Sequence, residues 1–188
     1  AVGVRISPVQ VPWEIKKLLE IVSKVKPRIM LEIGASQGGT LFLLTQVADS
    51  GTTIISIDLP RVRGGYPDWK SIIYKSFKRH RQKLHLIRGD SHNRQILNII
   101  KNIVSGEKLG FLFIDGDHTY DGVKRDFEMY APLVKEGGII AFHDICPHPP
   151  QTRCEVNKFW REIKDKYKHI EVVEDWKQGW AGIGVLYV

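Results

Sequence analysis

Apolar positions along the chain follow two spacings that alternate with each other. Apolar residues recur at helical spacing in six segments, which predicts helices at residues 12–27, 40–47, 69–81, 96–104, 122–130 and 156–167. Short apolar runs bounded by polar or turn residues predict strands at residues 29–33, 53–57, 84–87, 111–114, 138–142, 170–173 and 182–188. Strands that alternate with helices in this way indicate βαβ units around a parallel sheet.

The last two predicted strands differ from the others. Too few residues join them for a helical crossover, so we expect them to pair antiparallel as a hairpin at the edge of the sheet. The expected fold class is therefore α/β, with a single doubly wound, mostly parallel seven-stranded sheet that ends in this hairpin. We expect residues 1–188 to form one domain, with residues 1–27 as a helical lead and residues 61–83 as a basic helical segment.

The composition is that of a globular protein. The chain has 188 residues, of which 43% are hydrophobic and 26% charged, which argues against disorder, collagen and coiled coil. Its apolar runs are far shorter than the roughly 20 residues that cross a bilayer, so we expect no membrane insertion. Residues 1–5 lack the features of a secretion signal, which favours a cytoplasmic location. The two cysteines, Cys146 and Cys154, fit neither a disulfide framework nor a CxxC motif, and we interpret them as inert thiols.

The net charge of +7 is concentrated in one segment. Residues 61–88 contain nine lysines and arginines but a single acid, Asp68, whereas the rest of the chain is nearly neutral. A patch of this kind attracts phosphates, acidic substrates or anionic surfaces, although it is also typical of a solvated helix face.

Candidate ligand-binding residues follow the predicted strands, because open α/β sheets bind ligands at the carboxyl ends of their strands. The glycines between Gly34 and Gly39 allow a tight turn with free N–H groups at the start of a helix. A dinucleotide fingerprint needs a glycine where Ser36 stands, which argues against NAD. Asp58 and Asp90 close the next two strands, where a carboxylate can bind a ribose diol or an adenine edge, or simply cap a helix.

Together with the final hairpin, these residues resemble class I S-adenosylmethionine-dependent methyltransferases. The stretch 114–126, continued at residues 137–144, is similar to the group of macrocin-type O-methyltransferases and cephalosporin hydroxylase-like proteins. The resemblance implies that the ribose of S-adenosylmethionine binds Asp58. It also implies two sets of cofactor-binding residues: Glu32, Gly34, Ala35, Ser36 and Gly38 at the methionine end, and Asp90 with Ser91 at the adenine. Asp115 joins the cofactor-binding set.

The same resemblance implies a divalent cation held by Asp115, His143 and Asp144. A cation such as Mg²⁺ lowers the pKa of a bound hydroxyl group and orients it for attack. His118 stands where relatives carry a lysine thought to be the base, and histidine titrates near neutral pH, so Asp115 and His118 are the expected catalytic residues. Imidazole favours zinc, iron or manganese over magnesium, which leaves the identity of the metal open, a two-histidine iron site included.

Two classes of function remain from these observations. The first is metal-assisted O-methylation of a small-molecule hydroxyl. The sequence leaves the oligomeric state open, and a homo-oligomer is suggested only because relatives often associate. The alternative is a nucleic-acid methyltransferase or an RNA-binding protein that uses the basic patch at residues 61–88 to contact phosphates. An interaction protein without activity is a third reading, against which the acidic residues Glu32, Asp58 and Asp115 argue.

Overall fold

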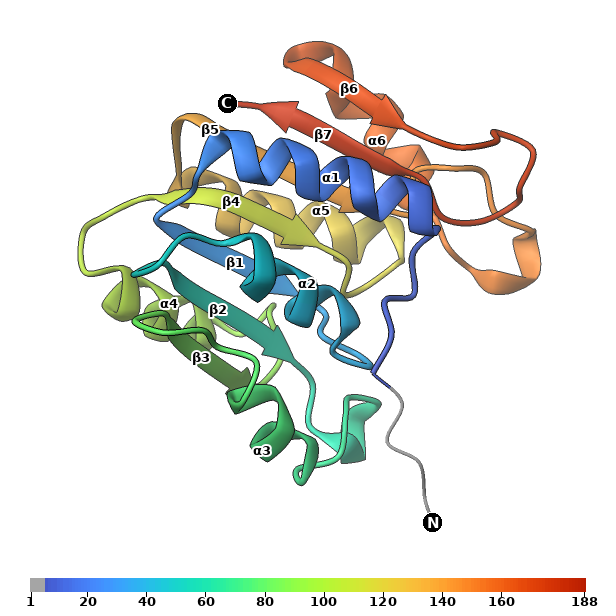
Figure 1. Ribbon diagram of the computed structural model, residues 1–188. Coiled ribbons are helices and arrows are strands. Elements are labelled where there is room, and N and C mark those ends of the chain that lie inside the picture. Colours follow the sequence, from blue (N-terminus) through green and yellow to red (C-terminus); the bar gives the residue numbers. More distant parts are fainter. Residues whose placement is uncertain (1–5) are drawn as a thin grey trace.

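A seven-stranded sheet forms the centre of the computed structural model, which describes residues 6–188 (Figure 1). Its strands lie in the order β3-β2-β1-β4-β5-β7-β6. The strands β3 to β5 in this order are parallel, and β7 runs antiparallel to both β5 and β6. This confirms the predicted mostly parallel sheet with an antiparallel pair at its edge. The bounds are β1 Ile29–Ile33, β2 Thr53–Asp58, β3 Lys83–Arg88, β4 Leu109–Ile114, β5 Val134–His143, β6 Lys168–Val172 and β7 Ile183–Tyr187.

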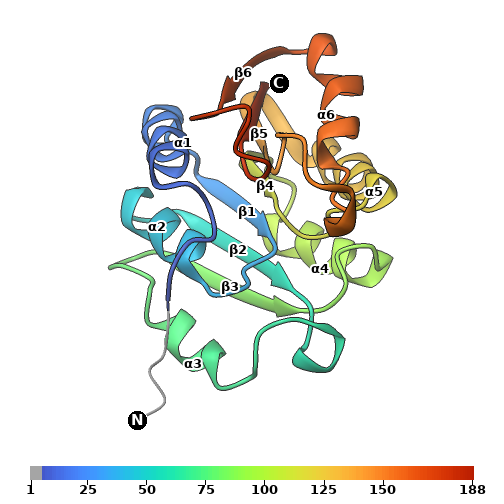
Figure 2. The ribbon, with the colours of Figure 1, turned by 90° about the vertical axis from the view of Figure 1, so that its right-hand side faces the viewer.

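Helices cover both faces of the sheet, as expected for a doubly wound fold (Figure 2). One face carries α1 (Pro12–Val25), α2 (Gly39–Val47) and α3 (Lys70–Lys75), and the other carries α4 (Arg94–Val104), α5 (Tyr120–Tyr130) and α6 (Val156–Ile163). Alternate residues of β4 serve the two faces: Phe111 packs with the α1 layer, whereas Leu112 packs with the α4–α6 layer. Residues 1–5 of the predicted lead, and the leader prediction made on them, lie outside the described residues.

Between residues 6 and 188, the structure contains no helix with the length and apolar character needed to span a bilayer.

The helix predicted at residues 69–81 was wrong in length. The basic segment 61–83 holds only a short 3-10 turn, Arg61–Arg63, and the six-residue α3. The chain turns after α3, with Arg81 at φ +64°, because the side chain of Gln82 is drawn inward to donate to the carbonyl oxygens of Thr45 and Ala48. The helix predicted at residues 156–167 likewise ends early, at Ile163, and a 3-10 turn follows it.

The order of the strands places the predicted site residues together. The chain winds outward in one direction from β1 through β2 to β3, and in the other from β4 to β5, so the switch point lies between β1 and β4. Ligands of open α/β sheets bind in the crevice at the carboxyl ends of the strands at this point. The loops that follow β1, β2, β3, β4 and β5 all reach this edge.

Candidate functional site

Two adjoining cavities open at the carboxyl edge of the sheet. The larger has a volume of about 570 Å³ and lies among the loops after β1, β2, β3 and β4. The smaller, of about 250 Å³, lies between the loop after β1, the end of β5 and the segment before α1. Gly34, Ser36, Asp115 and His118 line both of them. Ligands in the two cavities would therefore meet at these four residues.

The loop after β1 lies so close to the loop after β4 that it requires glycine. Gly34 has φ +97°, and a Cβ atom added there would lie 2.0 Å from the carbonyl oxygen of Asp115. Gly38 has φ +79°, and its Cβ atom would lie 2.4 Å from the ring of Tyr74. At Gly34 the loop thus presents bare backbone to the shared wall of the cavities, whereas Gly38 makes room for the ring of Tyr74.

Ser36 is held in a left-handed conformation, with φ +45°, by two hydrogen bonds. Its N–H donates to Oδ2 of Asp58 at 2.6 Å, and its carbonyl oxygen accepts the hydroxyl of Tyr74 at 2.9 Å. No pattern in the sequence indicated a role for Tyr74, which is fully buried although it lies in the basic segment. The short helix α3 therefore supports the loop after β1.

Acidic residues line the larger cavity where the sequence placed them, with one exception. Asp58, Asp90 and Ser91 all line it, and burial raises the pKa of the Asp58 carboxyl. Glu32 lines neither cavity: it lies inside the sheet, where its Oε2 accepts the hydroxyl of Ser56 at 2.7 Å. Burial raises the pKa of Glu32 to about 8, and its Oε1 has no hydrogen-bond partner among residues 6–188.

Side chains of helix α5 contact the turn after β3. The carboxylate of Asp126 is fully buried, and its Oδ1 lies 3.3 Å from Nε2 of His92, which lines the larger cavity. Tyr130 donates its hydroxyl to the carbonyl oxygen of Ser91 at 2.7 Å, and Arg125 donates to the carbonyl oxygen of His92 at 3.1 Å. A sign of this contact in the sequence is the acidic residue Asp126, which occupies a buried position of an amphipathic helix.

Replacing His92 with glutamine is expected to lower the free energy of unfolding by about 2 kcal/mol at pH 6, the range for a hydrogen bond to a charged group. The bond to Asp126 raises the pKa of His92 above its ordinary 6.5. A raised pKa in the folded state stabilises fully below the ordinary value, and this stabilisation is lost as the pH rises through the folded pKa. Urea denaturation of both proteins from pH 6 to pH 9 measures this. A difference that stays constant with pH would contradict the ion pair.

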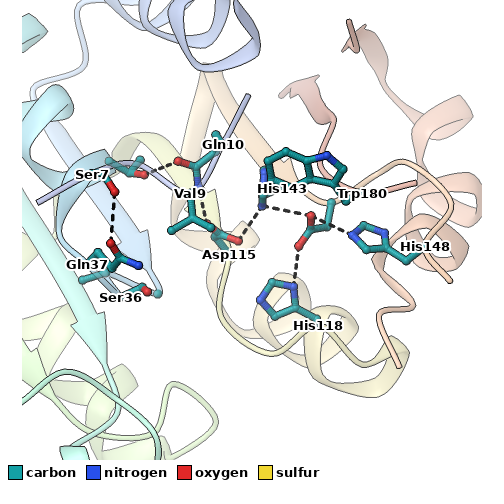
Figure 3. Close-up of a pocket in the computed structure, with 15 residues that line it drawn as sticks. Ser7, Val9, Gln10, Ser36, Gln37, Asp115, His118, His143, His148 and Trp180 are labelled. Atoms are coloured by element: carbon teal, nitrogen blue, oxygen red, sulfur yellow. Dashed lines mark hydrogen bonds and ion pairs between the residues drawn. The ribbon is translucent and has the colours of Figure 1, made fainter. Parts of the chain in front are cut away.

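Asp115 and His143 form the centre of the smaller cavity (Figure 3). Nδ1 of His143 lies 3.1 Å from Oδ1 of Asp115 and 3.3 Å from Oδ1 of Asp144. The amide of Gln10 donates to Oδ2 of Asp115 at 2.8 Å, and Thr40 donates its hydroxyl to Gln10 at 2.8 Å. No pattern in the sequence pointed to Gln10, which reaches the site from the segment before α1.

Asp144 is the point on which three imidazoles converge. Its Oδ2 lies 2.7 Å from Nδ1 of His118, and its Oδ1 lies 3.1 Å from Nε2 of His148 and accepts the N–H of Ala181 at 3.0 Å. In Figure 3, His118, His143 and His148 approach from different sides. His148, to which the sequence analysis assigned no role, thus belongs to the site.

These contacts strongly shift the pKa values of His118, His143 and Asp144. The hydrogen bond to Asp144 raises the pKa of His118 to about 11. Burial lowers the pKa of His143, but the charge of Asp115 and the neighbouring carboxylates outweigh it and raise the value to about 10. Burial likewise opposes ionisation of Asp144, yet the hydrogen bonds from His118 and His143 hold its pKa well below the usual range. Without a metal, imidazolium charges therefore balance the carboxylates at neutral pH.

The donor atoms present fit a divalent cation. Asp115, His143 and Asp144 each offer one ligand atom, and these three atoms lie within 4.8 Å of one another. The carboxylates of Asp115 and Asp144 pair with the imidazoles of His118 and His143. A bound cation would take the place of the positive charge that these imidazoles supply. The mixture of carboxylate and imidazole suits manganese, iron or zinc at least as well as magnesium.

Some cations of the basic patch pair with other groups of the chain. Arg63 lines the larger cavity and pairs with Oδ2 of Asp90 at 2.9 Å. The guanidinium of Arg88 lies 3.7 Å above the ring of Tyr66 and pairs with Asp68 at 3.3 Å. With Arg79, which donates to the carbonyl oxygen of Gln46, three of the nine cations thus have partners within the chain.

Comparison with known proteins agrees with this architecture. A family model described as a methyltransferase domain matches residues 31–145. An uncharacterized protein of Acanthamoeba polyphaga mimivirus is 33% identical over 136 residues, which is 71% of this chain and 60% of the viral protein. The chain thus spans about three fifths of the length of this curated relative.

Solved structures of O-methyltransferases share the fold at low sequence identity. The O-methyltransferase from Bacillus cereus in complex with SAH superposes with a TM-score of 0.69 at 18% identity, over 96% of this chain and 84% of that one. TomG of Streptomyces achromogenes, an O-methyltransferase involved in tomaymycin synthesis and solved with SAM, superposes with a TM-score of 0.70 at 16% identity, over 96% and 81%.

Proposed function

Because this chain belongs to the methyltransferase domain family, we propose that it transfers the methyl group of S-adenosylmethionine to a hydroxyl group of a small molecule, assisted by a divalent cation. The observation that carries the proposal is the pair of cavities that share Asp115 and His118. A methyl donor in the larger cavity and an acceptor in the smaller one would meet there. Methyl transfer needs mainly this positioning, because the positive charge of the sulfonium already makes the departing neutral sulfide a good leaving group.

The larger cavity is the proposed cofactor site. Its volume lies within the range of ordinary ligand pockets. We assign the methionine end to Gly34 and Ser36, the ribose to Asp58, and the adenine to Asp90 and Ser91. Of the other residues expected at the methionine end, Ala35 lines the smaller cavity and Gly38 lines neither. Glu32 lies inside the sheet, where it accepts the hydroxyl of Ser56, and does not form the cavity wall.

The smaller cavity is the proposed acceptor site. Asp115, His143 and Asp144 would hold the cation, which when bound lowers the pKa of the acceptor hydroxyl. His118 lines both cavities and is the proposed proton acceptor. With Nδ1 bonded to Asp144, its Nε2 is the nitrogen for that proton, and Asp144 stabilises the imidazolium that forms. The neutral imidazole needed beforehand is favoured when Asp144 is engaged by a cation, because like charges disfavour each other.

Calorimetric titration with S-adenosylmethionine, with and without Mn²⁺ or Mg²⁺, tests the proposal, followed by a screen of hydroxylated acceptors. We expect one cofactor to bind per chain, and we expect methyl transfer to a small-molecule hydroxyl that a chelator removes while cofactor binding persists. Absence of cofactor binding would overturn the assignment. Methylation of RNA, lost on charge reversal at Lys78, Arg79, Arg81 and Lys83, would favour the nucleic-acid alternative instead.

A further inference from the structure

Cys154 lies beside the proposed proton acceptor, at the edge of the smaller cavity's side-chain cluster. It is half-buried, and its thiol lies near the imidazole of His118. One ligand atom each from His118, Asp144 and Cys154 lies within 4.8 Å of the other two. A nitrogen, an oxygen and a sulfur donor, contributed by three separate segments of the chain, thus converge outside the Asp115–His143–Asp144 set.

Backbone contacts fix this juxtaposition. The N–H of Glu155, the next residue, donates to the carbonyl oxygen of His118 at 2.7 Å. The N–H of Cys154 itself donates to the hydroxyl of Thr152 at 3.2 Å, in a turn where Arg153 has φ +56°. The loop that carries the thiol is therefore tied across to the loop after β4, and the sulfur is held opposite the imidazole.

We propose that His118, Asp144 and Cys154 form a second cation site, selective for a thiophilic divalent ion such as Zn²⁺ and sharing Asp144 with the first. Three protein ligands with a fourth position open are typical of zinc sites that exchange a ligand. A thiolate selects zinc or cobalt, whereas magnesium and calcium require oxygen donors. The ion has access, because 43% of the His118 side chain is exposed.

Occupation of this site has a consequence for catalysis that rests on the proposed function. A neutral imidazole that binds the ion through either nitrogen carries its proton on the other, so its Nε2 cannot accept a proton from the acceptor hydroxyl. Binding also releases protons, because the thiol must ionise and the binding nitrogen must be free. The second site is therefore a site of zinc inhibition, at which Cys154 is not the inert thiol that the sequence alone suggested.

A Co²⁺ titration of the full chain, followed by absorption spectroscopy, tests the site without cofactor or acceptor. A thiolate bound to Co²⁺ gives a charge-transfer band in the near ultraviolet. We expect this band in the natural protein and in Asp115→Asn, and we expect Zn²⁺ to displace it. It should be lost in Cys154→Ser and in His118→Ala, with Zn²⁺ affinity reduced at least about tenfold. Circular dichroism verifies that each variant is folded.

Cys146→Ser is the matched control, because it removes the other thiol, which is buried and points to Gln178. The band must survive this change. A natural protein saturated with Co²⁺ that shows no band, a band that persists in Cys154→Ser, or a band lost in Cys146→Ser would each overturn the proposal. Because neither S-adenosylmethionine nor an acceptor is present, this result is independent of whether methyl transfer is found.

Discussion

Replacing Gly34 with alanine is expected to destabilise the protein by about 3 kcal/mol and to abolish cofactor binding. The conformation at φ +97° costs an alanine roughly 1 kcal/mol. The larger cost is steric, since the new Cβ atom would lie 2.0 Å from the carbonyl oxygen of Asp115, and both partners belong to backbone at the ends of central strands. Forced overpacking of this kind costs a further 1–3 kcal/mol or so. To relieve this clash, the loop after β1 and the loop after β4, which form the shared wall of the cavities, must move apart.

Gly137→Ala provides a control with the same chemical change. Gly137 also has a positive φ, +73°, but no atom lies within 4 Å of its added Cβ among the residues described. We expect a loss of about 1 kcal/mol and unchanged cofactor binding. Urea denaturation and calorimetric titration with S-adenosylhomocysteine measure both quantities. Equal losses in the two variants would show that the contact between Gly34 and Asp115 is unimportant.

Replacing Asp115 with asparagine is expected to lower turnover by about a hundredfold or more while changing cofactor affinity less than about threefold. The substitution keeps the shape of the side chain but removes the charge that faces His143. A cation acting as a Lewis acid contributes several kcal/mol to the transition state, and that contribution needs its carboxylate ligand. The contacts proposed for the cofactor at Asp58 and Asp90, which line the larger cavity, are unchanged by this substitution.

Two measurements separate this prediction from a general loss of structure. Binding of Mn²⁺, followed by electron paramagnetic resonance, should weaken in Asp115→Asn but persist in Asp121→Asn, an identical change at an exposed position of α5. Turnover in Asp121→Asn should remain within about twofold of the natural protein, as is usual for surface substitutions. If Asp115→Asn lowers cofactor affinity as much as it lowers turnover, Asp115 does not act through a cation.

Local patterns along the chain were sufficient for the sheet and for its functional edge. Strands show as short apolar runs because a central parallel strand, such as β4, is buried on both faces. Once parallel pairing is known, the carboxyl ends must share one edge, so Asp58, Asp90 and Asp115 could be grouped without coordinates. Glu32 shows the limit of this reasoning, because it belongs to the body of β1 rather than to its end.

The partners of these residues could not be found from spacing. Gln10 contacts Asp115 across 105 positions of the chain, and Tyr74 contacts Ser36 across 38. Hydrogen bonds of this kind produce no periodic pattern in the sequence, because each depends on how separate segments of the chain pack. The same holds for Cys154, which the sequence separates from His118 by a strand and a helix, and for the early end of α3.

The sequence therefore determined the elements, their order and the chemistry at the strand ends, because those follow from periodicity and from the direction of parallel strands. Only the tertiary structure decided which groups neutralise one another. It buried Asp126 against His92, brought three imidazoles to Asp144 and placed a thiol beside His118. The physical reason is that charge and ligand geometry depend on distances in space, which chain separation does not encode.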